Sequence, residues 1–142
     1  ATSYEEILED ARSRGFMAIC NTDNEIGKSS SIKLGVRESD EDANMMFFVA
    51  DQPLLSKETC EKLIESFKET KLMTYPVVGM RRGAPVIFPA SFREKLLSLE
   101  ADQGGMIFAK DGKTNKVPIE NEDELLDIDT LEAYEKLRRD HE

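Results

Sequence analysis

Met45-Met46-Phe47-Phe48-Val49-Ala50-Asp51 is the stretch that decides the fold class of this chain. Its six apolar residues are continuous rather than alternating, and polar residues flank them on both sides. A short continuous run of this kind predicts a strand that is buried on both faces, as in a parallel sheet. We therefore expect residues 45–50 to form a central parallel strand, with Asp51 at its carboxyl end.

The residues upstream predict a helix, a strand and a second helix. Residues 3–14 carry apolar side chains at helical spacing, with Ser3 as the expected N-cap and Gly15 in position to end the helix. Residues 16–20 form another continuous apolar run and predict a second strand buried on both faces. Residues 29–36 follow as a helix that its own serines should cap. The expected strand at 16–20, the helix at 29–36 and the strand at 45–50 fit a right-handed βαβ unit.

The residues downstream continue this alternation. Ser56 is the expected N-cap of a helix whose apolar stripe contains Cys60, Leu63, Ile64 and Phe67. Two extended pieces are expected next, at 75–78 and 84–88, followed by a helix at 90–97. A turn at 102–105 should open a short helical segment. The last expected elements are strands at 116–119 and 125–128 and a final helix capped by Asp129. Alternating helices and strands of this kind predict an α/β fold.

Length and charge limit the classes of function. The chain has 142 residues, which suits a single domain spanning residues 1–142. It carries 19 basic and 29 acidic residues, a formal net charge of −10, so we expect no binding to nucleic acid through phosphate neutralisation. The longest uncharged apolar run, residues 45–50, is far too short to span a bilayer, and we expect no membrane partner. An acidic protein that acts on anionic substrates is expected to need a metal ion between itself and them.

The histidine and cysteine content limits the chemistry. The single histidine is His141, at the penultimate position, which argues against Ser-His-Asp, Cys-His and His-rich zinc sites. The two cysteines, Cys20 and Cys60, form no CxxC pair, and the first residues show no signal-peptide pattern, so we expect a reduced, cytoplasmic protein. Catalysis would then depend on carboxylates, Lys, Arg, backbone amides and a hard metal ion.

Three carboxylates lie at or just beyond the ends of predicted strands. Asp51 stands where open α/β sheets bind their ligands, beyond the carboxyl end of a strand, although it could equally serve only to terminate the strand. Asp127 and Asp129 would point to one face of an extended segment, but an N-cap at Asp129 and a solvated charge at Asp127 explain them more simply. The two interpretations are compatible, and Asp51 and Asp129 could share one Mg²⁺.

Three other motifs have simpler explanations. Gly27-Lys28-Ser29 lacks the earlier glycine of a phosphate-binding loop, because Thr22 occupies that position, so a helix start is favoured. Arg81-Arg82-Gly83 could clamp an anion, but an exposed hairpin tip is the default interpretation. The acidic residues at 120–124 are expected to be a solvated surface.

Six motifs then follow one another in a defined order. They are Asn21; Gly27 with Ser30-Ser31-Ile32; Asp51-Gln52-Pro53-Leu54-Leu55; Gly83-Ala84-Pro85-Val86-Ile87-Phe88; Leu99-Glu100-Ala101-Asp102-Gln103-Gly104-Gly105; and Asp127-Ile128-Asp129-Thr130. Together they resemble the MobA-like nucleotidyltransferases, and most closely the molybdenum cofactor cytidylyltransferase branch. The resemblance runs over essentially the whole chain, and the Asp-Gln-Pro-Leu and Asp-Ile-Asp-Thr motifs are fairly specific in combination.

The resemblance implies a three-layer α/β/α, Rossmann-like fold with a mostly parallel sheet, like that of the nucleotide-diphospho-sugar transferases. It implies transfer of CMP or GMP from CTP or GTP to a molybdopterin-type acceptor, with Mg²⁺ as cofactor and release of pyrophosphate. Asp51 matches the catalytic, metal-binding aspartate, Asp129 matches a second metal- or phosphate-facing position, and Asn21 matches a residue close to the nucleotide. The residues that match the acceptor side are Gly83, Pro85, Asp102 and Gly104.

The sequence also departs from the family pattern. The first strand, a Gly-rich loop containing Ser-x-Arg-Met-Gly and a Lys are not in this sequence, so it is expected to be the C-terminal two-thirds of such a domain and inactive by itself. Ala101 replaces the usual Gly before Asp102, and Met106 replaces the usual Arg. Two alternatives stay open. One is a non-catalytic α/β module that binds the acceptor or docks on a molybdoenzyme or its chaperone. The other is a nucleotidyltransferase for another phosphorylated acceptor, such as a sugar phosphate or phospholactate.

Overall fold

The computed structural model describes residues 1–22, 27–110, 112–126 and 131–140. The chain divides into two compact units. The first contains Ala1–Met45 and Pro89–Lys113, and the second contains Met46–Phe88 and Thr114–Glu142. Among the described helices, none is both long enough and apolar enough to cross a membrane.

The first helix of unit 1 is α1 (Glu5–Ser13). It ends as predicted, because Gly15 follows in a left-handed conformation with φ +85° and donates its N–H to the Arg12 carbonyl at 3.0 Å. Its N-cap residue is Tyr4 rather than the expected Ser3, and Tyr4 N–H binds the hydroxyl oxygen of Thr2 at 3.2 Å. The helix therefore starts one residue later than the serine motif predicts.

The predicted strand at residues 16–20 is wrong. In the described part of the chain this segment forms no strand, and Cys20 makes an isolated parallel bridge to Thr2. Phe16 and Met17 are 65% and 75% exposed. A buried strand needs partner strands along its edges and other elements packed on both of its faces, and a run of apolar residues does not reveal whether these exist.

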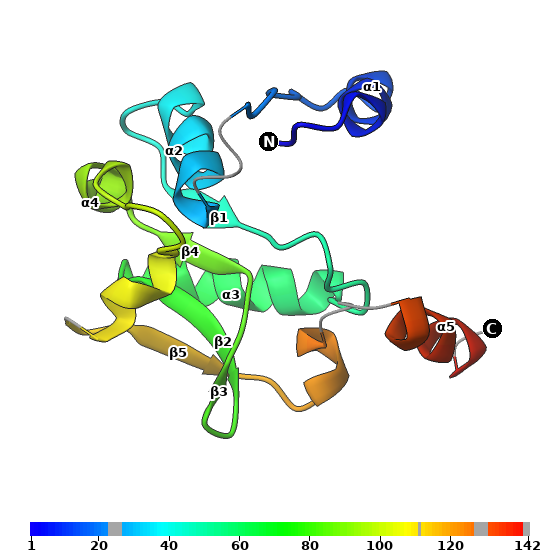
Figure 1. Ribbon diagram of the computed structural model, residues 1–142. Coiled ribbons are helices and arrows are strands. Elements are labelled where there is room, and N and C mark those ends of the chain that lie inside the picture. The colour runs from blue at the N-terminus through cyan, green and yellow to red at the C-terminus, as the bar shows by residue number, and fades with distance from the viewer. Residues whose placement is uncertain (23–26, 111, 127–130, 141–142) are drawn as a thin grey trace. The chain divides into compact units, whose positions relative to one another are not determined.

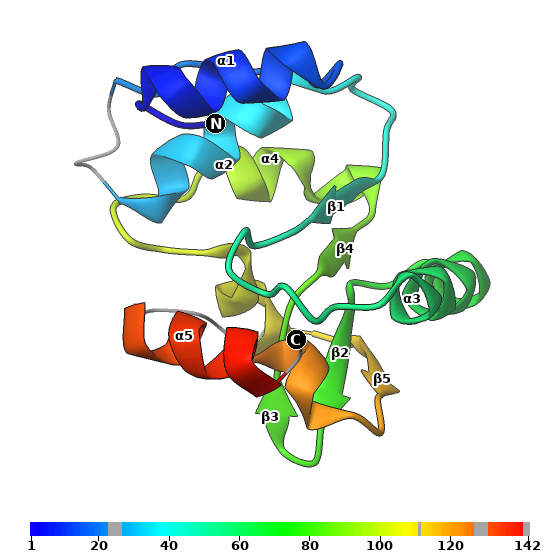
Figure 2. The same ribbon diagram turned by 90° about the vertical axis from the view of Figure 1, so that its right-hand side faces the viewer.

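Helices α2 (Lys28–Glu38) and α4 (Arg93–Leu97) confirm the two helices predicted at these places, with a 3₁₀ turn, η2 (Ala90–Phe92), opening the second. They pack against each other, as Figure 2 shows, and Val36 and Leu96 are completely buried. Both residues belong to the apolar core of unit 1.

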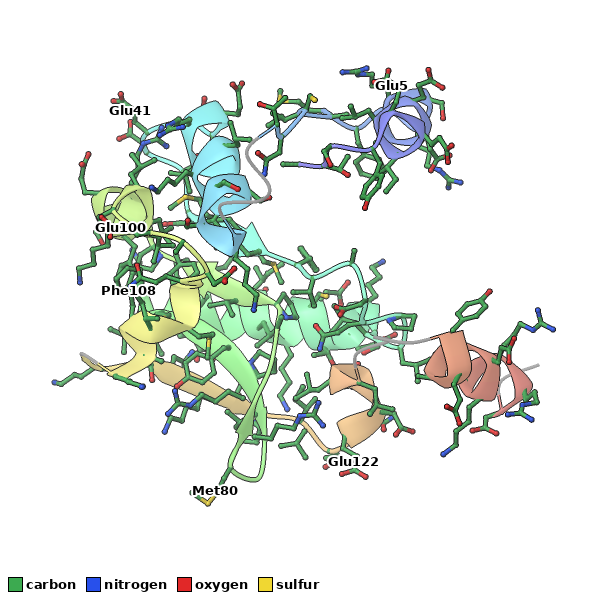
Figure 3. The ribbon with its side chains drawn as sticks, viewed as in Figure 1. Glu5, Glu41, Met80, Glu100, Phe108 and Glu122 are labelled. Atoms are coloured by element: carbon green, nitrogen blue, oxygen red, sulfur yellow. The ribbon has the colours of Figure 1, made fainter. Side chains whose placement is uncertain are left out.

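An arginine of α4 closes the C-terminal end of α2. Arg93 donates from Nη1 to the carbonyl oxygen of Ser39 at 3.2 Å and to its hydroxyl oxygen at 3.1 Å. A cation at the end of a helix complements the helix dipole. The next segment, η3 (Gly105–Lys110), is the predicted short helical segment, and it carries Phe108, labelled in Figure 3. The ring of Phe108 packs edge-on against that of Phe92, with centroids 6.1 Å apart.

The strands that follow build one open sheet, most of it in unit 2. They are β1 (Met45–Phe47), β2 (Thr74–Val78), β3 (Arg81–Arg82), β4 (Val86–Phe88) and β5 (Asn115–Pro118). Their order is β1-β4-β2-β3, and β5 also pairs with β2. The pairing of β2 with β5 is parallel, whereas β3 and β4 run antiparallel to β2. The sheet with its helices confirms the α/β class.

Strand β1 is shorter and less central than predicted. Phe48, Val49 and Ala50 lie beyond its end and are exposed. Within the described strands β1 stands at one end of the order, next to β4, rather than between two neighbours. Its apolar residues instead pack towards the core, where the rings of Phe47 and Phe88 meet edge-on with centroids 5.7 Å apart.

Helix α3 (Lys57–Thr70) confirms the clearest of the helix predictions. Ser56 caps it, because the Ser56 hydroxyl oxygen accepts the Thr59 N–H at 3.1 Å. The helix lies against strands β2 and β5, as Figure 1 shows. Leu63 and Phe67 from its apolar stripe form the buried core together with Ile87, Val117 and the partly buried Met46.

The C-terminal segment departs from prediction at residue 125. Leu125 is the last residue of a 3₁₀ helix, η4 (Glu122–Leu125), and not part of a strand. The Asn121 side chain accepts the Asp123 N–H at 3.0 Å, a local hydrogen bond that favours a turn over an extended chain. Residues 127 and 128 lie outside the described residues. The last predicted helix is present as α5 (Leu131–Asp140), but its expected cap, Asp129, is not described.

Candidate functional site

The predicted site residues belong to both units. Unit 1 contains Asn21, Asp102 and Gly104, and unit 2 contains Asp51, Gly83 and Pro85. The remaining one, Asp129, lies outside the described residues. The described site residues thus form two sets of three, one in each unit.

Asn21 organises the start of α2. It is almost completely buried, and its Nδ2 donates to the hydroxyl oxygens of Ser30 at 3.0 Å and Ser31 at 2.9 Å. The Ser30 hydroxyl in turn donates to the Gly27 carbonyl at 2.9 Å. The prediction that the serines cap α2 is thus wrong, because Gly27 is the N-cap residue and the serines bind Asn21 and neighbouring carbonyls.

The beginning of α2 is also joined to the turn that carries Asp102. Ser29 donates to the Ala101 carbonyl from its N–H at 3.1 Å and from its hydroxyl at 2.7 Å. Ala101 has φ +50°, in the left-handed region that favours glycine. Asp102 itself is exposed, and a side chain at Gly104 would meet no atom of the described chain within 4 Å.

Gly27 is a residue whose importance the sequence motif understated. Its φ is +120°, and a Cβ at this position would lie 2.6 Å from the Ala101 carbonyl oxygen and against Asp102 Oδ1. The backbone of Gly27, at the start of α2, therefore packs directly against the backbone of Ala101. A glycine directly before a predicted helix was the available signal, but the close approach depends on a turn more than seventy residues away.

We expect Gly27→Ala to destabilise the protein by about 3 kcal/mol, since it adds backbone strain to an overlap with main-chain atoms that cannot rotate away. Urea unfolding followed by circular dichroism measures the change. Gly112→Ala is the matched control, because its Cβ would meet open space. Equal midpoints for the two variants would contradict the tight approach.

Asp51 begins a short turn between β1 and α3. The turn closes with a weak hydrogen bond from Leu55 N–H to the Gln52 carbonyl at 3.5 Å, and Ser56 then caps α3. Asp51 is half-buried, whereas the neighbouring Gln52 is buried. The predicted position of Asp51 immediately after the strand is close to what the structure shows, although three residues separate it from the end of β1.

A buried glutamate fixes the end of this turn. Glu124 is 7% exposed and accepts the Ser56 N–H at 2.8 Å and the Thr59 hydroxyl at 2.8 and 2.9 Å. Burial pushes the pKa of Glu124 upward, but the hydrogen bonds from Ser56 and Thr59 outweigh it and leave the pKa below its usual value. The prediction of a solvated acidic surface is wrong here. Glu122 and Asp123 are indeed exposed, and no sequence signal distinguishes Glu124 from them.

Packing explains the residues around Gly83. A Cβ at Gly83 would lie 2.7 to 2.8 Å from the methyl carbons of Leu125, and Arg81 Nη2 donates to the Leu125 carbonyl at 3.2 Å. Pro85, after a cis peptide bond, is buried. Arg81 and Arg82 form β3 and are not the hairpin tip that was predicted; the tip carries Met80, which points into solvent (Figure 3).

The described residues do not by themselves form a complete metal site. Among them, no group of three or more His, Cys, Asp and Glu side chains is placed to hold an ion. Asp51 offers one carboxylate, and the adjacent Gln52 has a buried amide oxygen without a hydrogen-bond donor. Mg²⁺ takes one or two protein carboxylates and completes its shell with water and substrate phosphates, so these oxygen donors fit such an ion.

These features define an α/β domain in which the turn after strand β1 carries the carboxylate of Asp51 and the buried amide oxygen of Gln52. The family model for the MobA-like NTP transferase domain matches residues 1–117, and the chain belongs to this family. Membership supports nucleotidyltransferase activity on an NTP substrate. No protein of curated function matches the chain in sequence.

Solved structures share the fold at low sequence identity. A homologue of Rv0371c from Mycobacterium sp. strain JC1 is 21% identical with TM-score 0.68, over 80% of this chain and 58% of its own. Rv0371c from Mycobacterium tuberculosis H37Rv is 16% identical with TM-score 0.79, over 97% and 73% of the two chains. A complex of Rv0371c with manganese, also from Mycobacterium tuberculosis H37Rv, is 19% identical with TM-score 0.67, over 90% of this chain and 72% of its own.

Molybdopterin-guanine dinucleotide biosynthesis protein A from Archaeoglobus fulgidus is also similar. It is 13% identical with TM-score 0.73, over 96% of this chain and 74% of its own. The chain thus spans about three-fifths to three-quarters of these relatives, which show that it has the fold of MobA-like nucleotidyltransferases.

Proposed function

We propose that this chain is part of a divalent-metal-dependent nucleotidyltransferase that transfers CMP or GMP from the NTP to a molybdopterin-type acceptor and releases pyrophosphate. The observation that carries the proposal is the half-buried Asp51 carboxylate, held in the turn between β1 and α3 of a MobA-like domain. The names of two relatives, one a manganese complex and one a molybdopterin-guanine dinucleotide biosynthesis protein, support the metal and the acceptor.

Asp51 and Asp129 would hold Mg²⁺, which neutralises negative charge on the reacting phosphates when it is bound. An acceptor phosphate oxygen attacks the α-phosphorus of the nucleotide in line, and pyrophosphate leaves. Such transfer requires alignment and charge neutralisation rather than a protein nucleophile. A chain whose single histidine is His141 can therefore support it.

Glu124 supports a shared site for the two aspartates. Ser56 lies five positions after Asp51, and Asp129 lies five positions after Glu124. The hydrogen bond from Ser56 N–H to Glu124 therefore ties the turn of Asp51 to the segment that leads to Asp129.

We assign the other predicted site residues to the two substrates. Asn21 is proposed to lie near the nucleotide, where its hydrogen bonds to Ser30 and Ser31 would set the first turn of α2. The residues proposed for the acceptor side are Gly83, Pro85, Asp102 and Gly104. A cytoplasmic molybdoenzyme or its chaperone would receive the product.

Nucleotide titrations of the 142-residue chain test the proposal. We expect CTP or GTP to bind with Mg²⁺ or Mn²⁺ present, and at least tenfold more weakly after EDTA, because the ion offsets repulsion between the triphosphate and a protein of net charge −10. Isothermal titration calorimetry measures the nucleotide affinity with the metal present and after EDTA. Addition of molybdopterin, with a sugar phosphate as control acceptor, distinguishes the acceptors. Metal-independent or absent binding would contradict the proposal.

A further inference from the structure

Gln52 has a buried side-chain oxygen without a partner. Its Oε1 is the one buried side-chain nitrogen or oxygen in the described part of the chain that has no hydrogen bond, and the residue is 8% exposed. The Gln52 carbonyl, by contrast, accepts the Leu55 N–H at 3.5 Å. The residue is thus held within the turn after Asp51 while its side-chain acceptor is unused.

Stability does not explain a glutamine at this position. A buried acceptor without a donor destabilises the fold, and an apolar side chain of similar length would avoid that loss. The buried Glu124 of η4, which binds the end of this turn, differs in this respect, because both of its carboxylate oxygens accept hydrogen bonds at 2.8 to 2.9 Å. A buried acceptor that the protein leaves unsatisfied calls for a partner from outside the chain.

We propose that the Gln52 amide oxygen accepts a hydrogen bond from the bound metal–nucleotide complex. The inference rests on the proposed function, which places the ion at the adjacent Asp51. A hydrogen-bond donor to this oxygen cannot be one of the unprotonated oxygens of the triphosphate. A water molecule on the ion, or a hydroxyl or amino group of the nucleoside, has the required chemistry, and Gln52 would then contribute to substrate specificity.

The test combines stability with binding in variants of the 142-residue chain. Gln52→Met removes the acceptor at similar length, and Gln52→Glu keeps an oxygen acceptor. Gln103→Met is the control for stability, because Gln103 Oε1 does have a donor, the Glu100 N–H at 2.8 Å. Asp51→Asn tests the proposed function in parallel. Urea unfolding measures stability, and calorimetry measures binding of Mn²⁺ alone, CTP or GTP alone, and each nucleotide with Mn²⁺.

We expect Gln52→Met to raise the folding equilibrium constant by about fivefold, whereas Gln103→Met does not raise it. The same Gln52→Met variant should bind the Mn²⁺–nucleotide complex about tenfold more weakly, and Gln52→Glu should bind within about threefold of wild type. Weaker binding of Mn²⁺ alone would identify a metal-bound water as the donor. Weaker binding only with nucleotide present would identify a nucleoside group.

Two results would overturn the inference. One is unchanged binding in Gln52→Met, and the other is a loss of stability in that variant, which would show that Oε1 already has a partner in the free protein. If only Asp51→Asn lost binding, the proposed function would be supported and the proposed role of Gln52 would be rejected. Loss in Gln52→Met alone would remove Asp51 from the site, and loss in neither variant would reject both.

Discussion

Asp51→Asn is expected to lower the turnover of the whole protein by about three orders of magnitude while its fold stays intact. Asparagine has the size of aspartate, so the turn between β1 and α3 can accommodate it. What the substitution removes is the negative charge that we assign to the metal. Initial rates of pyrophosphate release at saturating nucleotide and acceptor measure the effect.

Asp123→Asn is the matched control for this experiment. It makes the same change of charge on the exposed surface of η4, so turnover should stay within about twofold of wild type. Circular dichroism and urea midpoints of both variants should match those of the wild type. An Asp51→Asn enzyme with near-normal turnover would remove Asp51 from the metal site.

Glu124→Ala is expected to lower the free energy of unfolding by about 3 kcal/mol, because it leaves the Ser56 N–H and the Thr59 hydroxyl without their acceptor. Urea unfolding of the 142-residue chain measures the change. Glu122→Gln, on the exposed side of the same 3₁₀ helix, should change stability by less than about 0.5 kcal/mol. Equal losses in both variants would contradict the structural role of Glu124.

The lowered pKa of Glu124 also predicts a pH dependence. Its pKa in the folded protein lies below the usual 4.5, so around these pKa values the unfolded chain binds more protons than the folded one. The stability that the carboxylate contributes is fully present above pH 4.5 and is lost as the pH falls through the folded pKa. The difference in stability between wild type and Glu124→Gln should therefore shrink from neutral pH towards pH 3. A difference that does not vary with pH would contradict this assignment.

Local signals account for the parts of the fold that the sequence predicts well. The Ser56 cap and the apolar stripe of Leu63 and Phe67 act within one helix, and α3 forms as expected. The apolar runs at 16–20 and 45–50 predict burial, but strand formation depends on partners far away in sequence. Residues 16–20 accordingly form no strand in the described structure, and only Met45–Phe47 of the second run does.

The candidate site shows the same division. The position of Asp51 after β1 follows from the order of local elements. The role of Glu124 depends on hydrogen bonds to residues 65 and 68 positions away, and the requirement for glycine at 83 depends on Leu125. Such long-range contacts leave no pattern in a single sequence, and the carboxylates beside Glu124 look the same.

The interleaved layout of the two units affects how the protein emerges from the ribosome. Each unit combines two separate stretches of chain, and β2 pairs in parallel with β5, about forty residues later. The sheet therefore cannot be completed during translation until residue 118 has left the exit tunnel, and until then the backbone N–H and C=O groups of β2 that pair with β5 stay unpaired in the nascent polypeptide. Ribosome-bound fragments that stop before β5 should be sensitive to protease and prone to aggregate.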